Sequence, residues 1–371
     1  MIKNRKSIVV NYTGRKGGGS VYAYEMTKSL IENGCKVYGI ISKDIDNISI
    51  WKELAFEKLI MIETYSNLFN YAVNTAKFKV FGVNKLKKEF AGIHIDAVYV
   101  PMIQPWTSLI NKLFKKSQKI VTLHDPKPHS GSISYFDKLC RKASVEADDI
   151  VILSEAYREY TTQQFNKEKE DIYVIPHGVF DYYKEVQSSD SSIEYDKDKI
   201  NFLFFGRITR YKGLHVLSEA YKKLSKQFDN ITLTVVGSGN FDDYRKEYSL
   251  LKNVIIINRW IRDEEVGCFF KGCNIVTVLP YTDATQSGVI SVAMEYKSLV
   301  IASNIGGLAE QVKHKETGYL FEANNADSLY EVMKYVVEYY SEQEQLKQNA
   351  VKYIRSLSWD VLGRKLLEII R

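Results

Sequence analysis

The sequence predicts an α/β protein of two domains, each a parallel β-sheet with helices packed on both faces. Three observations support this fold class. The chain has 371 residues, which exceeds the size at which a single hydrophobic core usually keeps growing. Short apolar runs alternate with longer segments of helical periodicity, as in doubly wound sheets. A polar stretch at 188–198 interrupts this alternation once and is typical of a linker.

The strands are expected where the apolar runs lie, because strands buried on both faces lack a polar alternation. The first domain, residues 1–180, has five such runs, at 8–10, 37–41, 97–100, 120–123 and 150–153. The second domain, residues 181–356, has five more, at 202–205, 231–236, 254–257, 275–279 and 299–302. An amphipathic segment at 359–370 predicts a terminal helix.

Composition excludes several classes of protein. Hydrophobic residues make up 45% of the chain and charged residues 26%, which is typical of a soluble globular protein. The sequence has no run near the roughly 18 apolar residues of a membrane-spanning helix. Its basic first residues lead into a strand pattern instead of a signal peptide. We therefore expect a cytoplasmic protein with no nucleic-acid partner, and the scattered cysteines predict no metal site.

A glycine-rich loop at residues 14–20 follows the first expected strand and precedes a helix. Residues without side chains let a ligand approach the backbone, and a helix N-terminus presents N–H groups to an anion. The loop has neither the Lys-Ser/Thr ending of a P-loop nor the spacing of a dinucleotide fingerprint. It predicts a phosphate-facing loop, and a tight turn with only a structural role is the alternative.

A second turn between a strand and a helix carries two cations. Arg207 and Lys212 lie five residues apart within the segment 205–213. Both can converge near one helix N-terminus and neutralise a diphosphate. The alternative is a solvated basic turn.

A third loop, at 280–289, also joins a strand to a helix. The backbone amides of Ser287, Gly288 and Val289 would lie at the positive end of that helix and point at a phosphate. An ordinary strand–loop–helix unit without a ligand is the alternative.

In this order, the three motifs resemble those of the large retaining glycosyltransferase family 4, whose members have the GT-B fold. The resemblance extends from the glycine loop to Glu310. It implies two facing Rossmann-like domains with a cleft between them. It also implies that a C-terminal helix, about 357–371, crosses back to the first domain.

The resemblance implies roles for the matching residues. Arg207 and Lys212 match the catalytic pair on the diphosphate of the donor, and Gly18 and Gly19 match the loop near the same phosphates from the other domain. His124 follows a strand and matches the histidine beside the donor sugar, where it can bond a sugar hydroxyl or the phosphate. A buried structural histidine is the alternative.

Weaker expectations concern the base and the acceptor. Ile261 lies in the segment 258–262, whose backbone in the family reads the base of the nucleotide. Asp125 and His129 share the loop of His124 and are candidates for acceptor contacts.

The third loop departs from the family pattern, which has two glutamates separated by seven residues. Thr285 and Val292 occupy those positions, and neither can do the work of a carboxylate. A Gln-Ser-Gly version of the loop in one branch of the family matches residues 286–288, so we interpret Thr285 and Gln286 as part of a variant donor site. Glu295 could replace the ribose contact, or it could be a charge on the helix surface.

The resemblance implies transfer of a hexose-like unit from a nucleoside-diphosphate sugar to a hydroxyl acceptor, with retention and without cofactor or metal. The expected acceptor is a saccharide, free or lipid-linked, in surface-polysaccharide or glycolipid assembly. The alternatives are a GT-B sugar-nucleotide epimerase or phosphorylase, and a non-catalytic partner that binds sugar nucleotide.

Positive charge is concentrated in the first domain, which carries a net +7 while the whole chain carries +6. One cluster is formed by Lys77, Lys79, Lys85, Lys87 and Lys88, with aromatic residues between them, and another by Lys112, Lys115, Lys116 and Lys119. Such clusters predict reversible docking on an anionic membrane surface. A solvated basic face is the alternative.

Overall fold

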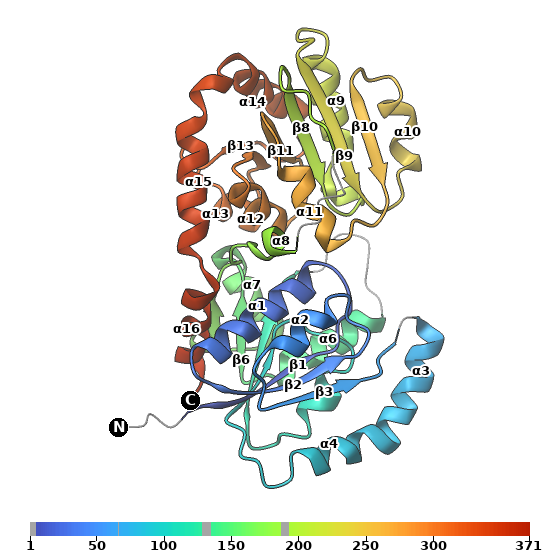
Figure 1. Cartoon of the computed structure of the whole chain (residues 1–371), viewed down its shortest axis with the longest axis vertical. Coiled ribbons are helices and arrows are strands. Elements are labelled where there is room, and N and C mark those ends of the chain that lie inside the picture. The colour runs from blue at the N-terminus through green and yellow to red at the C-terminus, as the bar shows by residue number, and fades with distance from the viewer. Residues whose placement is uncertain (1–4, 66, 128–134, 187–192) are drawn as a thin grey trace. The chain divides into compact units, whose positions relative to one another are not determined.

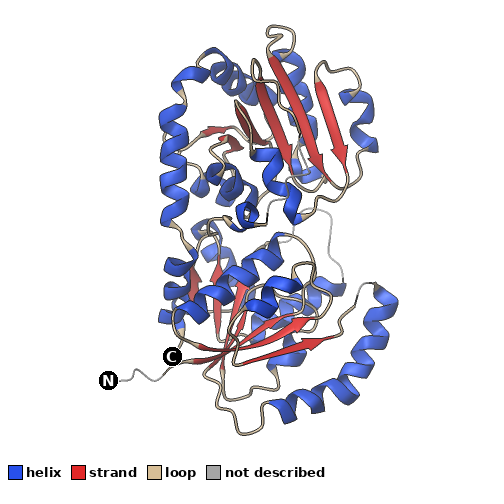
Figure 2. Cartoon of the chain, viewed as in Figure 1, coloured by secondary structure: helices blue, strands red, loops and turns tan. Residues whose placement is uncertain are grey.

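The computed structural model describes residues 5–65, 67–127, 135–186 and 193–371. The chain forms two compact units, one of Met1–Pro176 with Trp359–Arg371 and one of His177–Ser358 (Figure 1). Each unit is a parallel β-sheet with helices packed against it (Figure 2). The predicted α/β fold class is therefore confirmed.

The sheet of the first unit has the strand order β3-β2-β1-β4-β5-β6-β7, and every neighbouring pair is parallel. After β3 the chain returns to the centre of the sheet and adds β4 on the other side of β1. The boundary between β1 and β4 is therefore the switch point of this sheet. The strands are β1 Ser7–Tyr12, β2 Lys36–Ser42, β3 Lys58–Ile62, β4 Ala97–Val100, β5 Gln118–Leu123, β6 Asp149–Ile152 and β7 Ile172–Val174.

The helices of the first unit include a long segment in which two α-helices are joined by a π-helical turn. The bounds are α1 Gly18–Glu32, α2 Ile48–Glu53, α3 Leu68–Lys77, the π-turn η1 Phe78–Gly82, α4 Val83–Glu89, α5 Thr107–Asn111, α6 Tyr135–Glu146, α7 Arg158–Phe165 and α16 Trp359–Ile369. Two 3₁₀ turns, η2 Glu155–Tyr157 and η3 Lys169–Asp171, complete the set of described helical elements in this unit.

The last helix, α16, packs against α1, so the end of the chain belongs to the first unit, as predicted (Figure 1). The hydroxyl of Ser29 donates to the carbonyl oxygen of Trp359 at 2.7 Å. Gly363 allows this close approach, because a Cβ at this position would lie 2.0 Å from that hydroxyl. Arg371 then pairs with the fully buried Asp149 at 2.9 Å.

The second unit has a six-stranded parallel sheet of order β10-β9-β8-β11-β12-β13, with its switch point between β8 and β11. Its strands are β8 Ile200–Phe205, β9 Ile231–Gly237, β10 Val254–Asn258, β11 Ile275–Leu279, β12 Leu299–Ser303 and β13 Tyr319–Phe321. Its helical elements are α8 Tyr182–Glu185, η4 Arg210–Lys212, α9 Leu214–Leu224, α10 Asp242–Tyr248, α11 Asp263–Phe270, α12 Gly288–Glu295, α13 Gly306–Gln311, α14 Ala326–Glu338, η5 Tyr340–Glu342 and α15 Glu344–Ser356.

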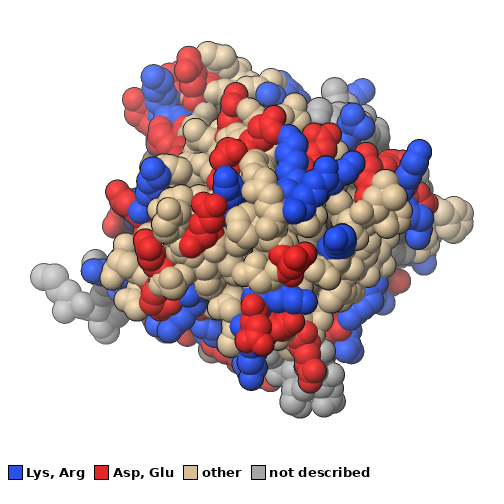
Figure 3. Space-filling view, turned by 90° about the horizontal axis from the view of Figure 1, so that it is seen from above, with Lys and Arg blue, Asp and Glu red and all other residues tan. Residues whose placement is uncertain are grey.

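Charged side chains of both signs are mixed on the face drawn in Figure 3, where basic and acidic groups lie interspersed. Within the described ranges, no helix has both the length and the apolar character that a crossing of the bilayer demands.

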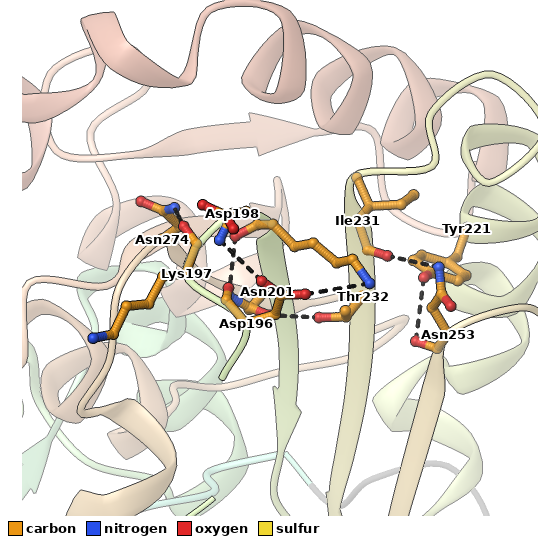
Figure 4. Close-up of polar contacts among 10 residues, drawn as sticks. Asp196, Lys197, Asp198, Asn201, Tyr221, Ile231, Thr232, Asn253 and Asn274 are labelled. Atoms are coloured by element: carbon orange, nitrogen blue, oxygen red, sulfur yellow. Dashed lines mark hydrogen bonds and ion pairs between the residues drawn. The ribbon is translucent and has the colours of Figure 1, made fainter. Parts of the chain in front are cut away.

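Polar side chains fix the amino ends of the strands in the second unit. Buried Asn201 donates from its amide nitrogen to the carbonyl oxygen of Asp196 at 3.0 Å (Figure 4). The same nitrogen of Asn201 donates to the carbonyl oxygens of Lys199 and Cys273 at 3.1 and 3.2 Å. Its amide oxygen accepts from the hydroxyl of Thr232 at 2.7 Å. These contacts have a structural role at the amino ends, whereas ligands of such sheets bind at the carboxyl ends.

Candidate functional site

The candidate site of the second unit lies at the switch point, where β8 and β11 are neighbours. Two loops leave the carboxyl ends of these strands and run to α9 and α12. Ligands of open α/β sheets bind in the crevice outside such a pair of strand ends.

The loop after β8 is fixed against the loop after β11. Gly213 has a φ of 72°, and a Cβ at this position would lie 1.6 Å from the carbonyl oxygen of Pro280. The amide of Thr282 donates to the carbonyl oxygen of Tyr211 at 2.8 Å. A side chain at position 213 would therefore separate the two loops.

Two tyrosine rings bring the cations of the β8 loop together. The ammonium of Lys212 lies 3.6 Å from the ring centroid of buried Tyr281 and 5.1 Å from that of Tyr211. The guanidinium of exposed Arg207 lies 3.5 Å from the hydroxyl of Tyr211. Burial raises the pKa of Tyr281, so this ring stays neutral beneath the lysine. The arrangement places two positive charges at one turn, as diphosphate recognition requires.

The loop before α12 is fixed by a side chain from α13, a helix later in the sequence. Gln311, at the end of α13, accepts at Oε1 from the amide of Ser287 at 2.8 Å. Its amide nitrogen donates to the carbonyl oxygen of the same residue at 3.1 Å. The amide of Ser287 is thus engaged inside the protein, and the amides of Gly288 and Val289 in the first turn of α12 are the remaining predicted donors.

Two buried polar atoms in these loops have no hydrogen-bond partner among the described residues: Oε1 of Gln286 and the hydroxyl of Thr209. Buried polar atoms without partners are costly, which makes both atoms candidates for ligand contacts. The sequence analysis named Gln286 but missed Thr209. The only feature that could have indicated Thr209 is its position two residues after Arg207 in the same loop. Thr285 is buried in the same loop.

A buried glutamate fixes the loop between β10 and α11. The carboxylate of Glu265 accepts hydrogen bonds from the guanidinium of Arg259 at 2.6 Å and from the backbone amide of Arg262 at 3.1 Å. The hydrogen bond from Arg259 is the main cause that lowers the pKa of Glu265 to about 2, against the opposing effect of burial. Ile261, the predicted base contact, is buried within this fixed loop.

Glu295 of α12 is buried and forms ion pairs with two other helices, so it is not a charge on the helix surface. Its carboxylate pairs with Lys184 of α8 at 2.5 Å and with Arg355 of α15 at 2.9 Å. Burial raises the pKa of Glu295, but the hydrogen bonds from Arg355 and Lys184 outweigh it, so the pKa is lowered overall. A ribose that bonded Glu295 would have to share the carboxylate with Lys184 and Arg355. Val292, one turn earlier, is buried and apolar.

In the first unit, the glycines of the loop after β1 differ in what they allow. Gly17 has a φ of 78°, which favours glycine. A Cβ at Gly14 would lie 2.4 Å from the hydroxyl of Tyr12, and one at Gly19 would lie 2.3 Å from the sulfur of Met102. A Cβ at Gly18 would meet nothing within 4 Å. The fold therefore explains every other glycine of the loop, while the space beside Gly18 is open.

His124 follows β5 and is held as a neutral imidazole. Its Nε2 lies 2.9 Å from the carbonyl oxygen of Pro101, and since a carbonyl only accepts, Nε2 carries the proton and Nδ1 is an acceptor. Burial lowers the pKa of His124. Its ring and that of Tyr22 of α1 form a T-shaped pair, with centroids 4.6 Å apart. An acceptor nitrogen suits a sugar hydroxyl better than a phosphate.

The two acceptor candidates are placed differently. Asp125 is exposed beside His124, and His129 lies outside the described residues. The predicted residues thus gather at two places. Those of the first unit lie after β1 and β5, and those of the second lie after β8, β10 and β11. No three His, Cys, Asp or Glu side chains in the described ranges gather as ligands of a metal ion.

Comparison with known sequences identifies both units. Residues 163–353 match the family described as Glycosyl transferases group 1, and residues 16–180 match Glycosyltransferase Family 4. An uncharacterized glycosyltransferase from Methanocaldococcus jannaschii is 25% identical over 240 residues, which are 62% of this chain and 61% of the relative. The match thus spans less than two thirds of that relative.

Two further similarities cover more of the chain. Phosphatidyl-myo-inositol mannosyltransferase from Mycobacterium leprae is 19% identical over 76% of this chain and 73% of the relative. The structure of Anabaena HepE in complex with UDP-glucose superposes with a TM-score of 0.72 at 16% identity, and covers 98% of each chain. This structural likeness supports the GT-B fold that the sequence resemblance implied.

Proposed function

This chain belongs to the group 1 glycosyltransferases, and we propose that it moves a sugar from a nucleoside diphosphate to a hydroxyl acceptor with retention at the anomeric carbon. The observation that carries this proposal is the pair of cations after β8. Lys212 is held on Tyr281, Arg207 reaches Tyr211, and both lie at the switch point of the sheet.

In the proposed reaction, the acceptor oxygen bonds to the anomeric carbon while the bond from that carbon to the diphosphate oxygen breaks. The acceptor proton goes to the departing phosphate on the same face of the sugar. Arg207 and Lys212 stabilise the charge that develops on the leaving group, and the amides of Gly288 and Val289 add preorganised donors. The neutral His124 accepts from a hydroxyl of the sugar. No metal has a part in this mechanism, because the two cations neutralise the diphosphate.

The relatives suggest which substrates to try first. HepE was crystallised with UDP-glucose, which makes uridine-diphosphate sugars the first donors to test. The mannosyltransferase relative is named for a lipid substrate, which supports a lipid-linked saccharide in glycolipid or surface-polysaccharide assembly as the acceptor. The residues themselves specify neither the sugar nor the base.

Donor binding is tested by thermal unfolding in the presence of a panel of sugar nucleotides, since a ligand of the folded state raises the Tm. With the stabilising donor, release of nucleoside diphosphate is then measured with and without candidate acceptors. Release that depends on acceptor, with a product of retained configuration by NMR, supports the proposal.

The same assay separates the alternatives. Interconversion of the donor sugar without acceptor would indicate an epimerase, and release by inorganic phosphate a phosphorylase. Binding without turnover for every acceptor would favour a non-catalytic partner, an interpretation motivated by Thr285 and Val292 in place of the paired glutamates.

A further inference from the structure

One face of the helical segment α3–η1–α4, residues 68–89, packs against the rest of the first unit. Phe78 stacks on Trp106 with ring centroids 4.8 Å apart, and both are buried in a cluster that includes Leu86. The indole nitrogen of Trp106 donates to the hydroxyl of Thr75 at 2.8 Å. The inward face of the segment is therefore already occupied by core contacts.

The π-turn explains how both halves of the segment use the same inward face. Phe78 and Leu86 are eight residues apart, which in a regular α-helix leaves them about 80° out of line. The wider turn at Phe78–Gly82 takes up one extra residue and compensates for this rotation. Phe78 and Leu86 thus both reach the core, and the residues opposite them face away from it.

The outward face of α3 and η1 is apolar. Phe69 is 77% exposed, Val80 57% and Phe81 73%, and Val73 is also exposed. Phe69, Val73 and Val80 follow a helical spacing of four and seven residues and form one stripe. A surface helix normally turns polar residues outward. A helix that is apolar on two sides indicates a partner for the second side.

The charge around this stripe is mainly basic, and the two acidic residues nearest in the sequence, Glu63 and Glu89, lie beyond its ends. Residues 64–88 contain five lysines, at 77, 79, 85, 87 and 88, and no acidic residue. All five lysine side chains are exposed. This contrasts with the mixed charges on the face in Figure 3. Exposed aromatic residues flanked by lysines are the composition of a helix that lies in a bilayer interface.

A hollow lies beside the segment on its inward side. It has a volume of about 210 Å³ and lies between the edge strand β3 and the helical segment. Ile60, Phe78 and Leu86 line it, together with Lys77 and Lys85 from the helix side and Glu63 from the strand side. Phe78 and Leu86 belong to the inward face of the segment, so this hollow is separate from the outward apolar stripe.

We propose that the outward face of residues 68–89 docks on an anionic phospholipid bilayer, with Phe69, Val80 and Phe81 entering the interface and the lysines binding the lipid phosphates. A second copy of this chain fits the surface less well, because two such faces would oppose five lysines to five. A soluble polyanion would leave the aromatic stripe in water. The proposal goes beyond sugar transfer and does not depend on the donor.

The test is cosedimentation of the full chain with vesicles of phosphatidylcholine alone or mixed with phosphatidylglycerol. Binding should require the anionic lipid and weaken with salt. Phe69→Ser with Phe81→Ser, and separately Lys85→Gln with Lys87→Gln and Lys88→Gln, should each lower the partition coefficient at least about tenfold. All five positions are exposed, so folding is retained, and an unchanged Tm confirms this.

The matched control removes equal charge from the other cluster of the same unit. Lys112→Gln with Lys115→Gln and Lys116→Gln should lower binding much less, since Lys112 already pairs with Glu146 at 3.4 Å. Equal losses in the two lysine triples would overturn the assignment to this helix. Equal binding to neutral vesicles, or none to either kind, would overturn the proposal. A dimer that the phenylalanine variant abolishes would assign the surface to a second copy instead.

Vesicle binding and donor binding are measured in separate experiments. Stabilisation by the sugar nucleotide should be unchanged in the Phe69→Ser, Phe81→Ser variant. Failure of docking with intact donor binding would refute this inference alone, and docking without any donor binding would refute the proposed function alone.

Discussion

The side chain of Gln311, at the end of α13, hydrogen-bonds both backbone polar groups of Ser287, which directly precedes α12. It accepts from the amide at 2.8 Å and donates to the carbonyl oxygen at 3.1 Å. One amide side chain therefore fixes the position of the loop from which α12 begins. Gly288 and Val289 follow directly in the chain, so their amides are oriented by the same contact.

Gln311→Ala is expected to raise the KM for the donor by about tenfold with a smaller change in kcat, because the loop loses two hydrogen bonds worth about 1 kcal/mol each. Steady-state kinetics over a range of donor concentrations measures the separate effects. Gln345→Ala, on the exposed side of α15, is the control. An unaltered KM would mean that the loop keeps its position without Gln311.

Arg207→Ala and Lys212→Ala should each lower kcat by on the order of a hundredfold or more, as loss of a transition-state donor does. The Tm should change little in the Arg207 variant, since that side chain is exposed. Arg210→Ala removes another exposed cation from the same turn and should leave turnover nearly intact. If both variants turn over like the wild type, the diphosphate interpretation is wrong.

Gly18→Ala should weaken donor binding by about tenfold while leaving the Tm unchanged, because the added methyl meets no atom of the protein but would meet a ligand at the backbone. Gly14→Ala is the contrasting variant. Its methyl would collide with the ring of Tyr12, so the Tm should fall. Full donor affinity in Gly18→Ala would leave the loop with a structural role only.

Glu265→Gln should lower the free energy of unfolding by about 1–3 kcal/mol at pH 7, because two arginines and a backbone amide lose their charged partner. The folded-state pKa of Glu265 is lowered to about 2 from an ordinary 4.5. Its contribution is therefore complete above pH 4.5 and is lost as the pH falls through 2.

Denaturant unfolding at pH 7 and at pH 3 measures this dependence, and the difference between Glu265→Gln and wild type should shrink at the lower pH. Glu264→Gln, at the exposed neighbouring position, controls for the loss of one charge. A difference that does not vary with pH would show that the charge of Glu265 contributes nothing.

Treatment with EDTA followed by gel filtration should leave the rate of transfer unchanged, because Arg207 and Lys212 neutralise the diphosphate without a metal ion. The transfer rate is compared before and after treatment, and again after Mg²⁺ is added back. A loss that Mg²⁺ restores would contradict the mechanism proposed above.

The three described strands that the sequence analysis did not predict lie at sheet edges, although the edge strand β10 was predicted from its apolar run. β3, β7 and β13 are all edge strands, and β7 and β13 have three residues each. An edge strand is covered less completely than a central one, so its sequence needs no long apolar run. β7 and β13 are too short for an apolar run of four residues, and β3 is only partly buried although its residues 59–62 are apolar.

The sequence by itself determined the α/β class, the two-unit order and the motifs after β1, β8 and β11, because these depend on local periodicity and on residues close together in the chain. Only the tertiary structure decided which polar groups are already engaged. Gln311 meets Ser287 across 24 positions, and Glu295 meets Lys184 and Arg355 across 111 and 60. Such pairs form when strands and helices pack, and no spacing along the chain encodes the distance between two side chains on different elements.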